Sequence, residues 1–347
     1  MTTSSPSDRK HFPVFVMGCH RSGTNLLYDM LLSAGGFAIY RGLLPIYKIL
    51  IPRFGSMENR ASRERILETW IRSKGFRRTG LDAEQLSGRI LNECRTGGDF
   101  IRVVMDSVAR SQHVQRWSVY DPDNVVHVER VKRDIPNALF VHIIRDGRDI
   151  ALSLKKMGGF TPMPWDRGQT DSLVATALYW EWMVHKGRFH GRKFPADYIE
   201  IHYEDLITNP HETLGKLGGF LDHDLDYDRT QRAGLGRLSE TNSSFREEGV
   251  LEKTNPLGRW KERLAHDEVA AIEATVGECL QENGYELSLP AAERRRGLRQ
   301  SCMHGMYPAF LSSKLLLKLH TPVGRLANMS ALELEEEPVQ VAEPVRS

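Results

Sequence analysis

Apolar runs alternate with polar, glycine-containing stretches along this chain, and their spacing predicts alternating strands and helices. Residues 12–17 and 139–144 are continuous apolar runs, which is typical of parallel strands that are buried on both faces. Each run is followed by a short polar turn and then by apolar residues at helical spacing, over 26–31 and 150–154. The pattern therefore predicts an α/β fold with a central parallel sheet flanked by helices.

The stretch between these two strands has mostly helical periodicity. Apolar residues recur at helical spacing over 62–108 and are interrupted at Gly75, Gly80 and Gly97-Gly98, so we expect a helical insertion at about 57–112. Helical periodicity returns over 213–220 and 269–280, and Asn283-Gly284 is a helix-end signal. The main domain is predicted to cover 12–290.

Both ends of the chain differ from this domain. Residues 1–11 are polar and are predicted to be flexible, and 333–347 contain Glu335 to Glu337 and are predicted to be disordered. Residues 291–332 form a predicted helical extension, whose amphipathic run over 306–319 is too short and too charged to span a bilayer. Docking on the domain or on a second copy, giving a homo-oligomer, is favoured over membrane-surface contact.

Composition and charge exclude several classes of protein. The chain has 347 residues, 40% of them hydrophobic, and a formal net charge of +2, which predicts a folded protein without a nucleic-acid partner. Its four cysteines have no C-x-x-C spacing, so neither a disulfide framework nor a zinc site is indicated. The N-terminal residues lack the apolar segment of a secretion signal, and a cytoplasmic location is expected.

The turn after the first strand carries the first candidate chemistry. Gly18-Cys19-His20-Arg21-Ser22-Gly23-Thr24-Asn25 joins a strand to a helix, so its amides and the helix dipole favour a bound anion. Thr24 stands where a nucleotide P-loop has its lysine, and Asn25 where that loop has its magnesium-binding hydroxyl. This departure argues against a kinase that uses Mg-ATP. An ordinary strand–helix turn is the alternative.

A second turn offers another arginine. Arg145 follows the apolar run 139–144, and therefore lies at the carboxyl end of a strand, where open α/β sheets bind ligands. Ser153 is about two helical turns further on. A simple ion pair of Arg145 with Asp146 or Asp149 is the alternative. Two such turns indicate a ligand with two separated anionic groups.

Four motifs together resemble one family. Gly18-x-x-Arg21-Ser22-Gly23-Thr24, Arg145-x7-Ser153, Tyr203-Glu204-Asp205-Leu206 and Gly258-Arg259-Trp260-Lys261 occur in this order. In order and spacing, over roughly residues 12–287, the chain resembles the sulfotransferases that use 3′-phosphoadenosine-5′-phosphosulfate. The resemblance implies a P-loop-NTPase-like architecture and a metal-independent, in-line transfer of a sulfuryl group to a hydroxyl or amine.

The resemblance also implies roles for individual residues. Arg21, Ser22, Gly23, Thr24 and Asn25 are expected to bind the 5′-phosphosulfate, and Arg21 and the loop amides to stabilise the charge that develops on the leaving oxygen. The 3′-phosphate is expected on Arg145 and Ser153, with Arg259 closing over it. Tyr203 is expected to contact adenine, the alternative being a half-buried tyrosine that closes a strand.

The general base is where this sequence departs from the family. Arg41, Gly42, Leu43 and Leu44 occupy the place of the usual glutamate, and Tyr120 stands where a lysine is usual. The nearest carboxylates by motif are Asp121 and Asp123, with His127 behind them, and these two aspartates are the predicted catalytic carboxylates. An Asp-Pro-Asp turn with only local hydrogen bonds is the alternative.

Other activities remain as alternatives at this point. A small-molecule kinase with a divergent P-loop and an inactive nucleotide-binding protein are both compatible with the first turn. The acceptor is expected to be a small molecule, a lipid or a carbohydrate. The apolar segment 40–54 and the amphipathic C-terminal helix favour a lipid or natural-product alcohol over a long anionic sugar chain.

Overall fold

A four-stranded parallel sheet forms the centre of the protein in this computed structural model, which describes residues 6–157, 169–233 and 256–335. The strand order is β2-β1-β3-β4. The strands are β1 (Val14–Gly18), β2 (Ser118–Tyr120), β3 (Leu139–Ile144) and β4 (Tyr198–His202). The parallel sheet that the two apolar runs predicted is confirmed, with β1 and β3 as its two central strands.

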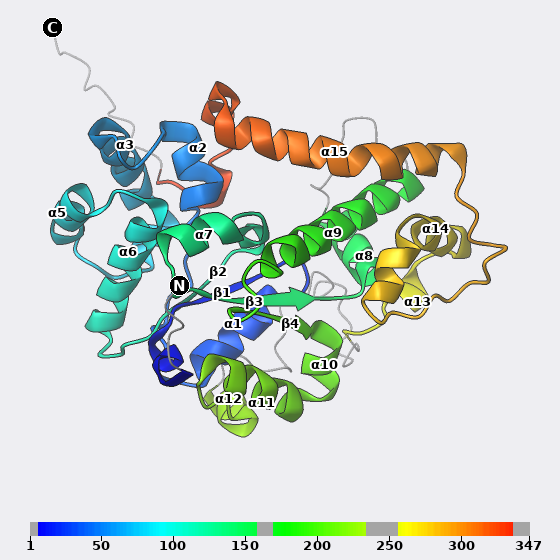
Figure 1. The fold of residues 1–347 in the computed structure, drawn as a ribbon, viewed down its shortest axis with the longest axis horizontal. Helices are drawn as coiled ribbons and strands as arrows, with labels where there is room; N and C mark the ends of the chain where they lie inside the picture. The colour runs from blue at the N-terminus through cyan, green and yellow to red at the C-terminus, as the bar shows by residue number, and fades with distance from the viewer. Residues whose placement is uncertain (1–5, 158–168, 234–255, 336–347) are drawn as a thin grey trace, which may run out of the picture.

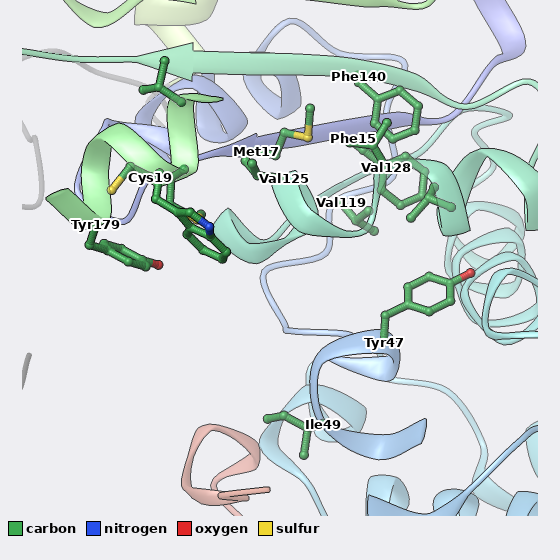
Figure 2. Packing of buried hydrophobic residues seen from close by; sticks show 14 of the residues in the cluster. Phe15, Met17, Cys19, Tyr47, Ile49, Val119, Val125, Val128, Phe140 and Tyr179 are labelled. Carbon is green, nitrogen blue, oxygen red and sulfur yellow. The ribbon is translucent and has the colours of Figure 1, made fainter. Parts of the chain in front are cut away.

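The central strands are buried, and apolar except for His142 of β3, because helices cover both faces of the sheet (Figure 1). Val14 and Val16 pack with α1 (Thr24–Ser33) and α11 (Pro210–Leu221) on one face. Phe15 and Met17 point to the opposite face, toward α8 (Gly147–Lys156) and α9 (Gln169–Gly191). On that face Phe15 stacks beside Phe140 of β3, with ring centroids 5.8 Å apart (Figure 2).

The chain segment that joins β1 to β2 is mostly helical. Its last helices are α3 (Arg60–Ile71), α4 (Lys74–Arg77), α5 (Ala83–Glu93) and α6 (Gly97–Ser111). A side chain caps each N-terminus, as Asp82 does by accepting the N–H of Gln85 and Thr96 by accepting that of Asp99. This group of helices lies beside the β2 edge of the sheet (Figure 1).

The C-terminal part adds α13 (Trp260–Arg263), α14 (His266–Glu282) and α15 (Leu298–His320). Gly284, with φ 76°, ends α14 as the Asn-Gly signal predicted. The long helix α15 crosses over α9 and reaches α2 (Ile51–Phe54) at its far end (Figure 1). The extension therefore spans the molecule from α14 to the β2 side of the sheet.

The short elements complete the chain. They are η1 (Pro6–His11), η2 (Ile46–Leu50, a π-helical turn), η3 (Pro122–Val126), α7 (Val128–Asp134), α10 (Tyr203–Thr208), α12 (Tyr227–Ala233), η6 (Pro322–Leu326) and η7 (Ser330–Leu332).

Two terminal segments are more ordered than their sequence indicated. Residues 6–11, within the predicted flexible N-terminus, form a helical turn from which Arg9 donates to the carbonyl of Phe220. Glu333 and Glu335, within the predicted disordered tail, pair with Lys74 at 2.5 Å and Arg77 at 3.0 Å. Opposite charges on α4 explain this order. Residues 1–5 and 336–347 lie outside the described residues.

Candidate active site at the carboxyl edge of the sheet

All four strands deliver a polar or aromatic residue to the same edge of the sheet. Cys19 follows β1, Asp121 follows β2, Arg145 follows β3 and Tyr203 follows β4. Because the strands are parallel, their carboxyl ends lie along one edge, which is the usual ligand side of such sheets. The strand order places Tyr203 at one end of this edge and Asp121 at the other.

The turn after β1 is shaped by two residues in the left-handed region. Gly23 has φ 96° and Arg21 has φ 74°. A Cβ on Gly23 would lie 2.4 Å from the ring of Tyr203, so a glycine is needed both for its conformation and for the close approach of that ring. Gly23 is the N-cap of α1, which makes Thr24 and Asn25 the first residues of the helix. Their N–H groups have no partner within the helix and are available to an anion.

Buried polar atoms at this turn fit an anionic ligand. The hydroxyl of Ser22 is buried and has no hydrogen-bond partner among the described residues, and the same is true of Nε of Arg145. Buried polar groups normally have partners. Together with the open amides of α1, these two donors fit a phosphate or sulfate group at the turn.

Three guanidinium groups gather around the turn. Arg21 donates from Nε to Oγ of Ser153 at 3.0 Å, and Arg145 donates from Nη1 to the carbonyl of Arg21 at 3.2 Å. Burial and the positive charge of Arg145 lower the pKa of Arg21, and the same two causes lower the pKa of Arg259. These cations repel one another in a partly desolvated place, so a bound anion stabilises them.

Arg145 is held from two sides. Its guanidinium lies 4.5 Å from the centre of the Tyr203 ring and donates to the carbonyl of Pro256 at 2.7 Å. Its one described carboxylate partner is Asp149, at 3.5 Å. The ion pair considered as the alternative role of Arg145 is therefore present, within a larger cluster of cations.

Asp149 also fixes the late turn that carries Arg259. Its two carboxylate oxygens accept the N–H of Gly258 at 2.9 Å and the N–H of Trp260 at 3.0 Å. Trp260 is buried, with the guanidinium of Arg148 3.8 Å from its ring centre. Asp149 therefore places Arg259 beside Arg145, a role that its sequence position did not reveal.

The predicted catalytic aspartates lie at the β2 end of the edge. Asp121 accepts the N–H of Asp123 at 3.0 Å and caps η3, and burial raises its pKa. Asp123 forms ion pairs with Lys48 and, at 3.6 Å, with Nε2 of His20. Burial acts in the opposite direction, but the hydrogen bonds and charges of His20 and Lys48 hold the pKa of Asp123 well below its usual range.

His20 and Lys48 are the site residues that sequence reasoning missed. His20 was part of the first motif, and Lys48 was one basic residue in an apolar segment, so neither had a distinguishing pattern. The ring of Tyr120, at the usual lysine position, packs instead against Tyr28 at 4.6 Å. His127 is buried 5.9 Å from the ring of Tyr47, and burial lowers its pKa to about 3.

Comparison with known proteins identifies the family of this chain. The family model described as "Sulfotransferase family" matches residues 13–227, which is more than half of the chain. The chain belongs to the sulfotransferase family. The match covers β1 to β4 and all of the predicted site residues except Arg259, which follows it.

Individual relatives of this sulfotransferase-family chain are distant. Mouse (Mus musculus) Sulfotransferase 1B1 is 26% identical over 26% of this chain and 32% of its own length. The matched segment spans about a third of the length of the curated relatives. The sulfotransferase domain from the curacin biosynthetic pathway has a TM-score of 0.46 at 14% identity, over 79% of this chain and 98% of that domain. Sulfotransferase STF9 from Mycobacterium avium gives 0.45 at 15% identity, over 80% and 78%.

Two further observations concern metals and membranes. Among the described residues, the group of histidine, cysteine and carboxylate side chains with donor atoms within 4.8 Å of one another is His185, Cys279 and Glu282, on α9 and α14. None of them belongs to the turns at the strand ends. No helix in the described part of the chain has the length and apolar character needed to cross a membrane.

Proposed function

We propose that this protein transfers a sulfuryl group from 3′-phosphoadenosine-5′-phosphosulfate to a hydroxyl or amine of a small-molecule, lipid or carbohydrate acceptor. The observation that carries the proposal is the cluster of Arg21, Arg145 and Arg259 at the ends of β1 and β3. Its positive charges fit a donor with two separated anionic groups, and family membership supports the reaction class.

The donor is proposed to lie along the β1–β3–β4 part of the edge. The 5′-phosphosulfate occupies the turn after β1, bound by Arg21, Ser22, Gly23, Thr24 and Asn25. The 3′-phosphate lies on Arg145 and Ser153, and Arg259 closes over it. Tyr203 contacts the adenine. The hydrogen bond between Arg21 and Ser153 at 3.0 Å supports placing the two phosphate sites next to each other.

The proposed reaction is a direct displacement at sulfur. The acceptor oxygen or nitrogen forms a bond to sulfur while the bond from sulfur to the 5′-phosphate oxygen breaks, and the adenosine bisphosphate leaves. Negative charge grows on that leaving oxygen, where Arg21 and the α1 amides stabilise it. The acceptor proton passes to the pair formed by Asp123 and His20, which we place at the nucleophile side because β2 adjoins β1.

The two aspartates have different roles in this proposal. Asp123 faces His20 and Lys48 and is the carboxylate of the acid–base pair. Asp121 is buried and accepts the N–H of Asp123, and we propose that it positions Asp123. A lysine is usual in the family at the position that Tyr120 occupies in this chain. In this proposal Lys48 supplies the positive charge of that missing lysine.

The first experiment is calorimetric titration with 3′,5′-adenosine bisphosphate and with ATP, each without and with magnesium. We expect the bisphosphate to bind at micromolar strength without metal. Arg145→Ala should weaken it by more than about 2 kcal/mol, because a charged partner of a phosphate is removed. Stronger binding of ATP with magnesium, or an unchanged Arg145→Ala, contradicts the proposal and favours the kinase alternative.

Three further parts of the hypothesis need separate measurements. Transfer is proposed to need no metal, so a chelator should leave the rate unchanged. A cytoplasmic location is also proposed and can be checked by fractionation. Association of two copies through the extension stays a prediction, which sedimentation of a variant altered at the exposed Leu316 and Leu317 would test.

A further inference from the structure

A large cavity lies beside the β2 end of the sheet. Its volume is about 1070 Å³, and it is lined by η2 and α2, the N-terminus of α6, α7 and the C-terminal end of α15 with η6. Such a volume is enough for a ligand of metabolite size. None of the expected donor-binding residues lines this cavity.

Its lining is strongly basic. Six arginines contribute to it, against the two carboxylates Glu58 and Asp134. The arginines are Arg53, Arg65, Arg95, Arg130, Arg133 and Arg325. The chain as a whole has a formal charge of only +2, so this concentration of charge is local and not a general feature of the surface.

Most of these arginines form no ion pair with a carboxylate of the described residues. Neither Arg95 nor Arg130 forms an ion pair among the described residues: Arg95 donates to the carbonyl of Cys94, and Arg130 lies over the ring of Tyr47 at 5.8 Å. Burial, together with the charge of Arg133, lowers the pKa of Arg130. Asp134 accepts the hydroxyl of Tyr47 at 2.7 Å and also pairs with Arg133 at 3.1 Å.

Apolar groups stand among the arginines. Tyr47, Ile51 and Phe54 line the cavity from η2 and α2, and Leu319 lines it from α15. Arginine fits phosphate, sulfate and carboxylate groups through paired hydrogen bonds. The lining therefore suits an organic molecule with at least one strongly anionic group, more than it suits a free inorganic ion.

The cavity and the proposed acid–base pair are both flanked by η2 and α15. Tyr47 of η2 lines the cavity, and its neighbour in the chain, Lys48, pairs with Asp123. Leu319 of α15 lines the cavity as well, and its neighbour Lys318 interacts electrostatically with Asp123 and Lys48. The cavity and the pair therefore lie on the same two elements, although none of His20, Lys48 and Asp123 lines the cavity.

We infer that this cavity binds the anionic group, a phosphate, sulfate or carboxylate, of the acceptor. The inference rests on the proposed transfer reaction and narrows its acceptor to an anionic alcohol or amine. The apolar segment 40–54 and the amphipathic C-terminal helix favoured a lipid or natural-product alcohol without specifying its charge. It also gives the extension a role, because α15 and η6 form one wall. Arg53 fastens that wall by donating to the carbonyls of Arg325 at 2.5 Å and Ala327 at 3.2 Å.

The first test is calorimetric titration of the full chain with inorganic pyrophosphate while the donor site is saturated with 3′,5′-adenosine bisphosphate. We expect binding, weakened at least tenfold in the double variant Arg95→Gln with Arg130→Gln, which loses two unpaired cations. The matched control is Arg60→Gln with Arg110→Gln, two exposed arginines outside the cavity, and it should bind as the wild type does. Thermal unfolding checks that all variants are folded.

Failure of this inference is distinguishable from failure of the proposed function. Pyrophosphate is also titrated into Arg145→Ala without bisphosphate, where binding in the cavity should persist. No binding of pyrophosphate, displacement of it by the bisphosphate, or an unchanged affinity in the Arg95 and Arg130 double variant each overturns the cavity assignment. Loss of bisphosphate binding would contradict the proposed donor site and would leave the cavity assignment unaffected.

The second test addresses the acceptor directly. Transfer from the donor is measured on alcohols paired with their phosphate esters, such as glucose and glucose 6-phosphate. We expect the phosphorylated member to have a KM at least tenfold lower, and the Arg95 and Arg130 double variant to lose this preference with kcat little changed. Transfer that prefers the neutral members, or a panel in which no phosphate preference is found, overturns the assignment of the cavity to the acceptor.

Discussion

The carboxyl edge of the sheet has a proposed donor half, at the ends of β1, β3 and β4, and a proposed acceptor half, at the β2 end around Asp123. The two halves are assembled in different ways. In the donor half, most site residues lie within a few positions of the strand that presents them, as Arg21 does after β1 and Arg145 after β3, and the exceptions are Ser153 and Arg259. In the acceptor half, Lys48, Asp123 and Lys318 come together from η2, η3 and α15. Local chain geometry therefore builds most of the donor half, and long-range packing builds the acceptor half.

This difference predicts different effects of substitution. Changes in the donor half should appear in bisphosphate binding and in the rate of the chemical step. Changes in the acceptor half should leave bisphosphate binding unaltered and should appear in kcat, in its pH profile and in the KM of the acceptor. The predictions below follow this division, and each could show that the two halves are not separable.

The largest effect is expected for Asp123→Asn, which removes the charge of the acid–base pair. We expect kcat to fall by about 10²- to 10⁴-fold, the usual contribution of a general base. Asp121→Asn is the comparison, since an amide oxygen can still accept the N–H of Asp123. Equal losses of kcat in the two variants would contradict the distinct roles proposed for the two aspartates.

The pH profile tests whether Asp123 takes the proton. The pKa of Asp123 is lowered, so this carboxylate stays ionised as the pH falls, and a reaction that uses it as the base keeps its rate down to about pH 4. A kcat that falls well above pH 4 would show that Asp123 is not the base. His20→Gln tests the other member of the pair, because an unchanged kcat in this variant would show that His20 does not take the proton.

Arg21→Ala should lower kcat by about 10²- to 10³-fold, because Arg21 is proposed to stabilise the leaving oxygen in the transition state. Arg21→Lys keeps the positive charge. Lysine and alanine are both strained by the positive φ at this position, so the strain is the same in both variants, and Arg21→Lys should recover part of the lost kcat. Rapid-quench measurement of a single turnover separates this step from product release. A kcat for Arg21→Ala within a few-fold of the wild type would remove Arg21 from the chemical step.

Gly23→Ala should destabilise the turn by about 1–3 kcal/mol, the usual cost of a strained backbone conformation. Its Cβ would also meet the Tyr203 ring at 2.4 Å, so bisphosphate binding should weaken together with stability. Gly88→Ala is the matched control in α5, where a Cβ meets nothing within 4 Å and alanine should stabilise the helix slightly. Urea unfolding of both variants measures the difference.

The smallest effect is expected for Asp149→Asn. The two carboxylate oxygens of Asp149 accept the N–H groups of Gly258 and Trp260. The asparagine side chain has one oxygen to accept one of these N–H groups, and its NH₂ group would face the other. The turn with Arg259 should therefore loosen. We expect bisphosphate affinity to fall by about 1 kcal/mol, or fivefold. The exposed Asp205, changed to Asn, should leave affinity unaltered, and an unaltered affinity in Asp149→Asn would show that Arg259 needs no such anchor.

Prediction from sequence succeeded where structure is decided locally. The apolar runs predicted the two central strands, and Gly18 to Asn25 predicted a strand–helix turn, because strand burial, glycine conformations and helix starts depend on neighbouring residues. The helix end at Gly284 was found for the same reason. The order seen at Glu333 and Glu335 was missed, because their partners Lys74 and Arg77 are far away in the sequence.

The sequence by itself determined the family, the central sheet and the arginine-containing turns, since these depend on hydrophobic periodicity and on residues close together in the chain. Only the tertiary structure decided that Asp149 anchors the turn of Arg259 and that His20 and Lys48 meet Asp123. It also decided that the end of α15 closes an arginine-lined cavity against η2, α2 and α7. These contacts join segments distant in sequence, and packing of the helices against the sheet brings them together.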